Sequence, residues 1–113
     1  MIKIYHNPRC SKSRLGLAAL EASGKEFEII KYLEDELSSK TLTSIISKLG
    51  IKPIDLVRKN EAIWKSDYKN KTLTDQELIE AMVKHPKLIE RPIVINGDKA
   101  VIGRPTEKIL EII

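Results

Sequence analysis

The sequence predicts an α/β protein in which a mixed four-stranded sheet is flanked by helices. Near the start, two apolar segments lie on either side of a segment with helical spacing, which predicts a strand–helix–strand unit and a parallel pair of strands. Near the end, an Asn-Gly turn between two short apolar segments predicts a hairpin and therefore an antiparallel pair. The residues between these two halves show helical patterns.

The first half is expected to begin with a strand over Met1–Tyr5, where apolar and polar residues alternate. A helix is expected to follow Cys10 and to end near Gly24, which is suited to cap it. A second strand is expected over residues 27–32. A strand, helix and strand of this length favour a right-handed crossover.

The middle of the chain is expected to start with a helix that Ser38 or Ser39 caps and Gly50 ends. Pro53 is well placed in the first turn of a short helix that follows. Residues 61–73 show no regular pattern and are expected to be irregular.

A capping box, Thr74-Asp75-Gln76-Glu77, predicts the start of another helix. His85 is expected to lie at the end of this helix, which Pro86 terminates.

The last part of the chain is expected to form a strand up to Ile95, a turn at Asn96-Gly97 and a return strand over residues 100–102. A final helix is expected to follow. Its buried side is predicted to hold Ile109, Leu110 and Ile113.

Composition excludes several classes of protein. The 113 residues suit one domain, and the net charge of +4 is spread without a continuous basic stripe, so we expect no nucleic-acid partner. The absence of a long apolar run and of a secretory signal favours a cytoplasmic protein with no membrane partner. One cysteine allows no internal disulfide, and no Cys/His cluster has the spacing of a metal site.

That single cysteine, Cys10, is expected where the first strand passes into a helix. The first amides of a helix have no partners within it and carry partial positive charge, so a thiolate there is stabilised and its pKa is lowered. Arg9, Lys12 and Arg14 add positive charge, as His6 would when protonated. A thiolate is a strong nucleophile, so the pattern points to covalent chemistry on an anion.

Three further arginines lie at expected loops or element ends, where side chains reach clefts: Arg58, Arg91 and Arg104. A planar guanidinium holds a tetrahedral oxyanion with two parallel hydrogen bonds. Their spacing alone does not show that the three side chains converge.

Several segments carry a resemblance to a known family. They are His6-Asn7-Pro8-x-Cys10-Ser11-Lys12-Ser13-Arg14, Leu56-Val57-Arg58-Lys59-Asn60, Thr74-Asp75 with His85-Pro86, Glu90-Arg91-Pro92-Ile93-Val94 and Gly103-Arg104-Pro105. In this order they resemble the glutaredoxin-coupled arsenate reductase family over essentially the whole chain. The resemblance implies a single thioredoxin-like domain over residues 1–113, with a helical insertion at about residues 38–86.

The resemblance also implies roles in arsenic detoxification at matching positions. Cys10 would attack arsenate and form a thiol-arsenate adduct, and an arginine clamp would hold the oxyanion: Arg58, Arg91 and Arg104.

Supporting roles are implied as well. His6 would help to lower the pKa of the cysteine, and Ser13 would hydrogen-bond the thiolate. Pro92 would be the cis-proline that faces the cysteine in thioredoxin-like folds.

Electron counting then constrains the partners. Reducing As(V) to As(III) takes two electrons, but Cys10-Ser11-Lys12-Ser13 offers no second thiol. An external thiol is needed, and in the family this thiol is glutathione, with glutaredoxin clearing the mixed disulfide. We therefore expect no bound cofactor, glutathione as co-substrate and a monomer.

Three alternatives follow from related chemistry. Spx-type regulators share the fold and bind RNA polymerase, but they carry a Cys-x-x-Cys motif as their redox switch. This chain has Ser13 at the position of the second cysteine. A monothiol glutaredoxin-like oxidoreductase would need Cys10 but no arginine clamp. A low-molecular-weight phosphatase requires Cys-x5-Arg, and Gly16 occupies the arginine position.

Overall fold

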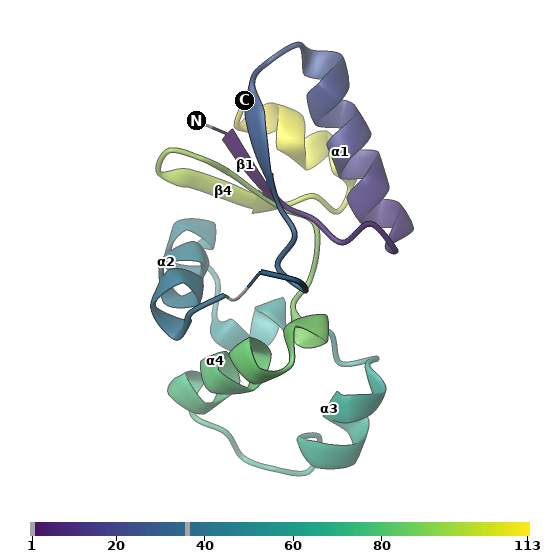
Figure 1. Ribbon diagram of the computed structural model, residues 1–113. Coiled ribbons are helices and arrows are strands. Elements are labelled where there is room, and N and C mark those ends of the chain that lie inside the picture. The colour runs from purple at the N-terminus through teal and green to yellow at the C-terminus, as the bar shows by residue number, and fades with distance from the viewer. Residues whose placement is uncertain (1, 36) are drawn as a thin grey trace. The chain divides into compact units, whose positions relative to one another are not determined.

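The computed structural model describes residues 2–35 and 37–113 of the chain. Over these residues four strands form one sheet in the order β2-β1-β3-β4 (Figure 1). The strands are β1 (Ile2–Tyr5), β2 (Phe27–Ile30), β3 (Ile93–Asn96) and β4 (Lys99–Ile102). Strand β1 is parallel to β2 and antiparallel to β3, so the expected mixed sheet is confirmed. Met1, where the first strand was expected to begin, lies outside the described residues.

One face of this sheet is covered by α1 (Ser11–Ser23) and by the 3-10 helix η3 (Thr106–Glu111), which contact each other. The strands and the two helices share one apolar core of buried residues: Ile2, Ile4, Leu20, Val94 and Ile109. Because Ile4 pairs with Ile29 on one side and Val94 on the other, β1 holds the centre of the sheet in register. Gly24 ends α1 with a left-handed φ of 73°, as expected.

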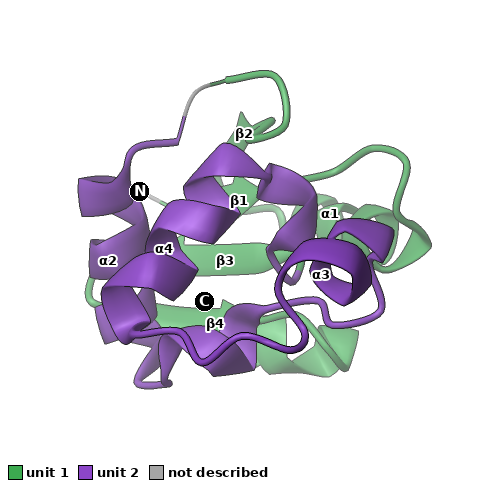
Figure 2. Cartoon of the chain, turned by 90° about the horizontal axis from the view of Figure 1, so that it is seen from below, with its two compact units in different colours: residues 1–36, 91–113 green, residues 37–90 purple. Residues whose placement is uncertain are grey.

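The chain divides into two compact units, which Figure 2 colours green and purple. Residues 1–36 and 91–113 form the unit with the sheet, and residues 37–90 form a helical unit. The helical unit contains α2 (Ser39–Leu49), η1 (Pro53–Leu56), α3 (Ala62–Asp67), α4 (Asp75–Lys84) and η2 (Pro86–Leu88). Within the described ranges, no helix combines the length and apolar character that crossing a membrane requires.

The helix ends of the second unit follow from local sequence. The Ser38 hydroxyl accepts a hydrogen bond from the Thr41 amide at 3.1 Å, and Gly50 closes α2 with a φ of 68°. At the start of α4, Thr74 and Glu77 exchange hydrogen bonds of 2.9 and 3.2 Å, which form the predicted capping box. These expectations are confirmed.

The expectation of an irregular segment over residues 61–73 is wrong in part. This segment contains α3, in which Trp64 is buried and stacks on Tyr68 with ring centroids 5.8 Å apart. A helix of six residues is too short to show a clear apolar period. Packing of one large aromatic residue stabilises it instead.

The hairpin between β3 and β4 is shifted from the predicted turn by one residue. Asn96 pairs with Lys99 and remains part of the ladder, so the connecting pair is Gly97-Asp98. Gly97 has a φ of 62°, and a glycine in the first central position suits a type II′ turn.

The final helix differs from the expectation in type and in its buried side. It is a 3-10 helix, in which residues three apart share a face. Ile109 is fully buried, but Leu110 is 58% exposed. The assumption of an α-helical period placed Leu110 on the wrong side.

Two glycines allow close packing around Pro92. A Cβ atom added at Gly16 of α1 would lie 2.7 Å from Cγ of Pro92, and one at Gly103 would lie 2.9 Å from the same atom. Such distances are shorter than carbon atoms tolerate. Both glycines are therefore required for the proline ring to pack between α1 and the end of β4.

We expect Gly16→Ala to lower the free energy of unfolding by about 1–3 kcal/mol, because the new methyl group overpacks this contact. The intrinsic helix preference of alanine acts in the opposite direction by about 1 kcal/mol. Urea denaturation measures the change. Leu15→Ala, at an exposed neighbouring position, should change stability by less than about 0.5 kcal/mol. An equal or higher stability of Gly16→Ala would contradict the packing argument.

Candidate active site

Cys10 lies between β1 and α1, as predicted. It is the N-cap residue of α1, with an extended backbone at φ −97° and ψ 123°. Its own amide donates to the carbonyl of Asn7 at 3.0 Å, which tightens the loop after the strand. The residue is half-buried and forms no internal disulfide, since the sequence offers no second cysteine.

The pKa of Cys10 is lowered to about 7. Burial of the thiol is the largest single effect and acts to raise the pKa. The Ser13 amide, the Arg91 guanidinium and the Lys12 amide together outweigh burial, because all three favour the thiolate. The helix amides and one arginine therefore keep a large fraction of the thiol ionised at neutral pH.

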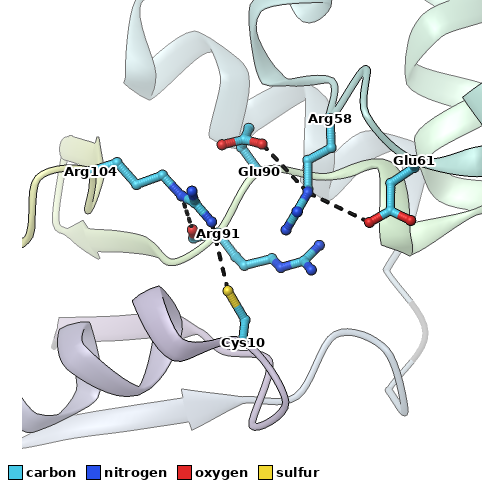
Figure 3. Close-up of polar contacts among 6 residues, drawn as sticks. All are labelled: Cys10, Arg58, Glu61, Glu90, Arg91 and Arg104. Atoms are coloured by element: carbon cyan, nitrogen blue, oxygen red, sulfur yellow. Dashed lines mark hydrogen bonds and ion pairs between the residues drawn. The ribbon is translucent and has the colours of Figure 1, made fainter.

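A second arginine of the same unit also reaches the sulfur. Nη2 of Arg104 lies 3.7 Å from Sγ of Cys10, a long hydrogen bond, while its Nε donates to the carbonyl of Arg91 at 2.8 Å (Figure 3). Two of the three expected arginines therefore lie beside the nucleophile. Because Arg104 is anchored through Nε, its planar head has a defined direction.

The third arginine, Arg58, belongs to the helical unit, and its side-chain contacts within that unit are with two glutamates. Its Nε lies 3.7 Å from Oε1 of Glu61 and 3.6 Å from Oε1 of Glu90 (Figure 3). It follows η1, and its amide donates to the carbonyl of Leu88 at 2.7 Å. A role of Arg58 toward an oxyanion stays a prediction.

His6 and Ser13 form a buried hydrogen bond of 2.7 Å between Nδ1 and Oγ. The pKa of His6 is lowered, first by burial and also by the nearby charges of Lys31 and Arg14, although a hydrogen bond to the backbone of Ser13 opposes this shift. His6 is therefore neutral at neutral pH and does not supply the positive charge that the sequence suggested. The Ser13 hydroxyl faces His6, so it is the Ser13 amide that acts on the sulfur.

The remaining predicted residues shape the surroundings of Cys10. The Arg91–Pro92 bond is cis, as the resemblance implied, and the Arg104–Pro105 bond is also cis, which was not anticipated. Arg14 donates from Nη1 to the carbonyl of Pro8 at 2.9 Å, so it ties the helix to the loop before it.

The comparisons with known proteins decide the family. The ArsC family model matches residues 5–112. The chain belongs to the ArsC family. It is 50% identical over 112 residues to the arsenate reductase of Haemophilus influenzae, with 97% of each chain covered. It is 46% identical over 114 residues to the uncharacterized protein YfgD of Escherichia coli, covering 99% of this chain and 96% of the relative.

The solved structures agree with this family. The arsenate reductase from Vibrio cholerae is 44% identical and superposes with a TM-score of 0.93, covering 99% of this chain and 97% of that one. The fold of this ArsC-family protein is therefore thioredoxin-like, with the four-stranded sheet described above.

One residue of the ArsC site was missed by the sequence analysis. Asn7 is buried and makes three hydrogen bonds. Its backbone amide donates to Ser13 Oγ at 2.9 Å, and its side-chain Oδ1 accepts from the Arg9 backbone amide at 3.0 Å. Its backbone carbonyl accepts from the Cys10 amide. An asparagine at the start of a Pro-containing turn is a known turn signal, and it could have been found.

We expect the alkylation rate of Cys10 by iodoacetamide to rise with pH around a midpoint near 7, because only the thiolate reacts. Arg91→Gln removes a group that lowers the pKa, so the midpoint should move to higher pH. Lys99→Gln, on β4, is the matched control and should leave the midpoint unchanged. A wild-type midpoint near the ordinary value of about 8.5 would contradict the account of the helix terminus.

Proposed function

We propose that this ArsC-family protein is an arsenate reductase in which Cys10 is the single nucleophile. The observation that supports this most directly is the setting of the sulfur, with a pKa of about 7, Arg104 Nη2 at 3.7 Å and Arg91 acting on it. A thiolate beside two guanidiniums is suited to attack an anion that the same guanidiniums bind. The arsenate reductases of similar sequence support arsenate as that anion.

In the first step, the Cys10 thiolate attacks arsenic and an S–As bond forms. One arsenate oxygen takes up two protons and leaves as water. Arg91 and Arg104 would hold the remaining oxygens through paired hydrogen bonds, because the guanidinium fork matches a tetrahedral oxyanion. Donors that are already in place when charge moves lower the barrier without further reorganisation.

The reduction takes place in the second step. An external thiolate attacks Sγ of Cys10, the S–As bond breaks, and its electron pair stays on arsenic, which leaves as arsenite. Cys10 and the external sulfur then form a mixed disulfide. A second external thiol attacks that disulfide and restores the Cys10 thiolate, so two thiols supply the two electrons.

We propose glutathione as the first external thiol and glutaredoxin as the protein that clears the mixed disulfide. Cys10 is the only cysteine in the sequence, so the resolving sulfur must come from another molecule. The scheme needs no bound cofactor.

The test is arsenate reduction with glutathione and glutaredoxin, followed by the arsenite formed. The native chain should turn over, and Cys10→Ser should not, because serine is not ionised at neutral pH and forms no disulfide. Turnover by Cys10→Ser, or none by the native chain, would overturn the proposal. RNA polymerase binding without turnover would favour the Spx-like regulator, and reduction of glutathionylated thiols alone would favour a monothiol glutaredoxin-like oxidoreductase.

We expect Arg91→Lys and Arg104→Lys each to raise KM for arsenate by roughly 10-fold or more. Lysine keeps the charge but loses the paired hydrogen bonds, which corresponds to about 1.4 kcal/mol or more of binding free energy. Steady-state kinetics measure KM and kcat separately. Lys99→Arg serves as the control, and an unchanged KM in both site variants would exclude a bidentate clamp.

A further inference from the structure

Asn7 lies two residues after β1 and three before Cys10, and none of the steps proposed above uses it. It is buried, with an exposed fraction of 6%. Its backbone makes two hydrogen bonds: the amide donates to Oγ of Ser13 at 2.9 Å, and the carbonyl accepts from the Cys10 amide at 3.0 Å. Most residue types could supply these two bonds. What is specific to asparagine is the third bond, made by the side chain.

The side chain of Asn7 closes the turn that leads to Cys10. Its Oδ1 accepts from the Arg9 amide at 3.0 Å. Pro8 lies between them and has no amide hydrogen, so the Arg9 amide is the first donor that this oxygen can meet. The Arg9 and Cys10 amides are thus both engaged within the turn. The amides that act on the sulfur belong to Lys12 and Ser13 of α1.

Asn7, Cys10 and Ser13 form a closed cycle of interactions. The Cys10 amide donates to the Asn7 carbonyl, the Asn7 amide donates to the Ser13 hydroxyl oxygen, and the Ser13 amide acts on the Cys10 sulfur. Ser13 is fully buried, and its hydroxyl also bonds to Nδ1 of His6 at 2.7 Å. The helix side of this cycle is therefore fixed by packing and by hydrogen bonds.

The loop side of the cycle is less protected, because Pro8 and Arg9 are exposed. Two side chains hold this loop. Arg14 donates from Nη1 to the Pro8 carbonyl in an exposed hydrogen bond, whereas the bond between the Arg9 amide and Asn7 is part-buried. Water competes less with a part-buried hydrogen bond, so Asn7 provides the firmer hold on the loop.

We propose that Asn7 is a positioning residue for the Cys10 nucleophile. Its side chain closes the turn through the Arg9 amide, and the closed turn keeps the sulfur in line with the Ser13 amide. The inference rests on the proposed function only in taking Cys10 as the nucleophile. It gives a neutral side chain, whose oxygen binds a backbone amide rather than the sulfur, a part in keeping that sulfur ionised.

The pH dependence of Cys10 alkylation by iodoacetamide tests this role. Asn7→Ala keeps both backbone hydrogen bonds of residue 7 possible but removes the acceptor of the Arg9 amide. A looser turn weakens the hydrogen bond that favours the thiolate, so the midpoint should move to higher pH. We expect alkylation at pH 6 to slow about threefold or more, which corresponds to a rise of roughly 0.5 in the pKa of Cys10.

Asn7→Ser measures rescue by a conservative change. It differs from Asn7→Ala by one hydroxyl oxygen, which can accept from the Arg9 amide more weakly than asparagine does. Its midpoint should therefore lie between those of the native chain and Asn7→Ala. Arg91 and Arg104 are the same in every protein compared, so the difference reports on the loop.

Asn96→Ala is the matched control. It also removes a hydrogen bond from an asparagine side chain to the backbone of the same unit, from Nδ2 to the Ile112 carbonyl at 2.6 Å. Asn96 pairs with Ile2 at the start of β1, whereas Cys10 follows the end of that strand. The control should keep the native midpoint even if its free energy of unfolding falls.

Hydrogen exchange of the native chain, followed by NMR, needs no variant. Arg9 is an exposed residue, but its amide should exchange with D2O about tenfold or more slowly than in an unstructured peptide of the same sequence, because Asn7 binds it. An Arg9 amide that exchanges as fast as in the peptide would overturn the proposal.

Three alkylation results would overturn it as well: a native midpoint in Asn7→Ala, a midpoint of Asn7→Ser no lower than that of Asn7→Ala, or an equal shift in Asn96→Ala. No arsenate is present in these experiments. Such a failure leaves the proposed arsenate reductase activity intact, and a protein without arsenate turnover would still show whether Asn7 controls the ionisation of Cys10.

Discussion

The structure of the site depends on one balance at Cys10. Burial of the sulfur favours the neutral thiol, whereas helix amides and the Arg91 guanidinium favour the thiolate and prevail. The fold creates this balance by ending β1 five residues before Cys10 and beginning α1 immediately after it. The nucleophile therefore lies at the positive end of the helix, and its reactivity is a property of the backbone as much as of neighbouring side chains.

The remainder of the sheet-containing unit keeps that backbone in place. Pro92 packs against Gly16 of α1 and against Gly103, so the segment that carries Arg91 is held against this helix. The Gly103 amide donates to the carbonyl of Pro92 at 2.8 Å, and Arg104 anchors itself on the carbonyl of Arg91. The segments that carry Cys10, Arg91 and Arg104 are distant in sequence but meet around one sulfur. The contacts with Pro92 that hold them together leave no room for a side chain at either glycine.

Much of the fold could be predicted from local sequence. The alternation in β1, the Gly24 cap and the Thr74 capping box each have a short-range physical cause, and the structure shows all three. Features that depend on tertiary packing were harder to predict. The short helix α3 is stabilised by Trp64, and the 3-10 geometry of η3 determines that Ile109 rather than Leu110 is buried.

The candidate site shows the same division. The location of Cys10 followed from the pattern of strand and helix, but the convergence of Arg91 and Arg104 on the sulfur could not be read from spacing. The neutral state of His6 depends on its burial and on the charges of Lys31 and Arg14, which only the folded chain brings near it.

The pairing of Arg58 with two glutamates has a consequence for the helical unit. Its Nε lies between the carboxylates of Glu61 and Glu90, next to the point where Val57 and Ile89 form an isolated β-bridge. A neutral residue in place of Arg58 would leave two negative charges facing each other across that bridge and would loosen the two chain segments it joins. Arg58 therefore holds the two loops together through its positive charge. Lysine at this position would keep that charge and remove only the planar guanidinium, so this variant tests the guanidinium without disrupting the local fold.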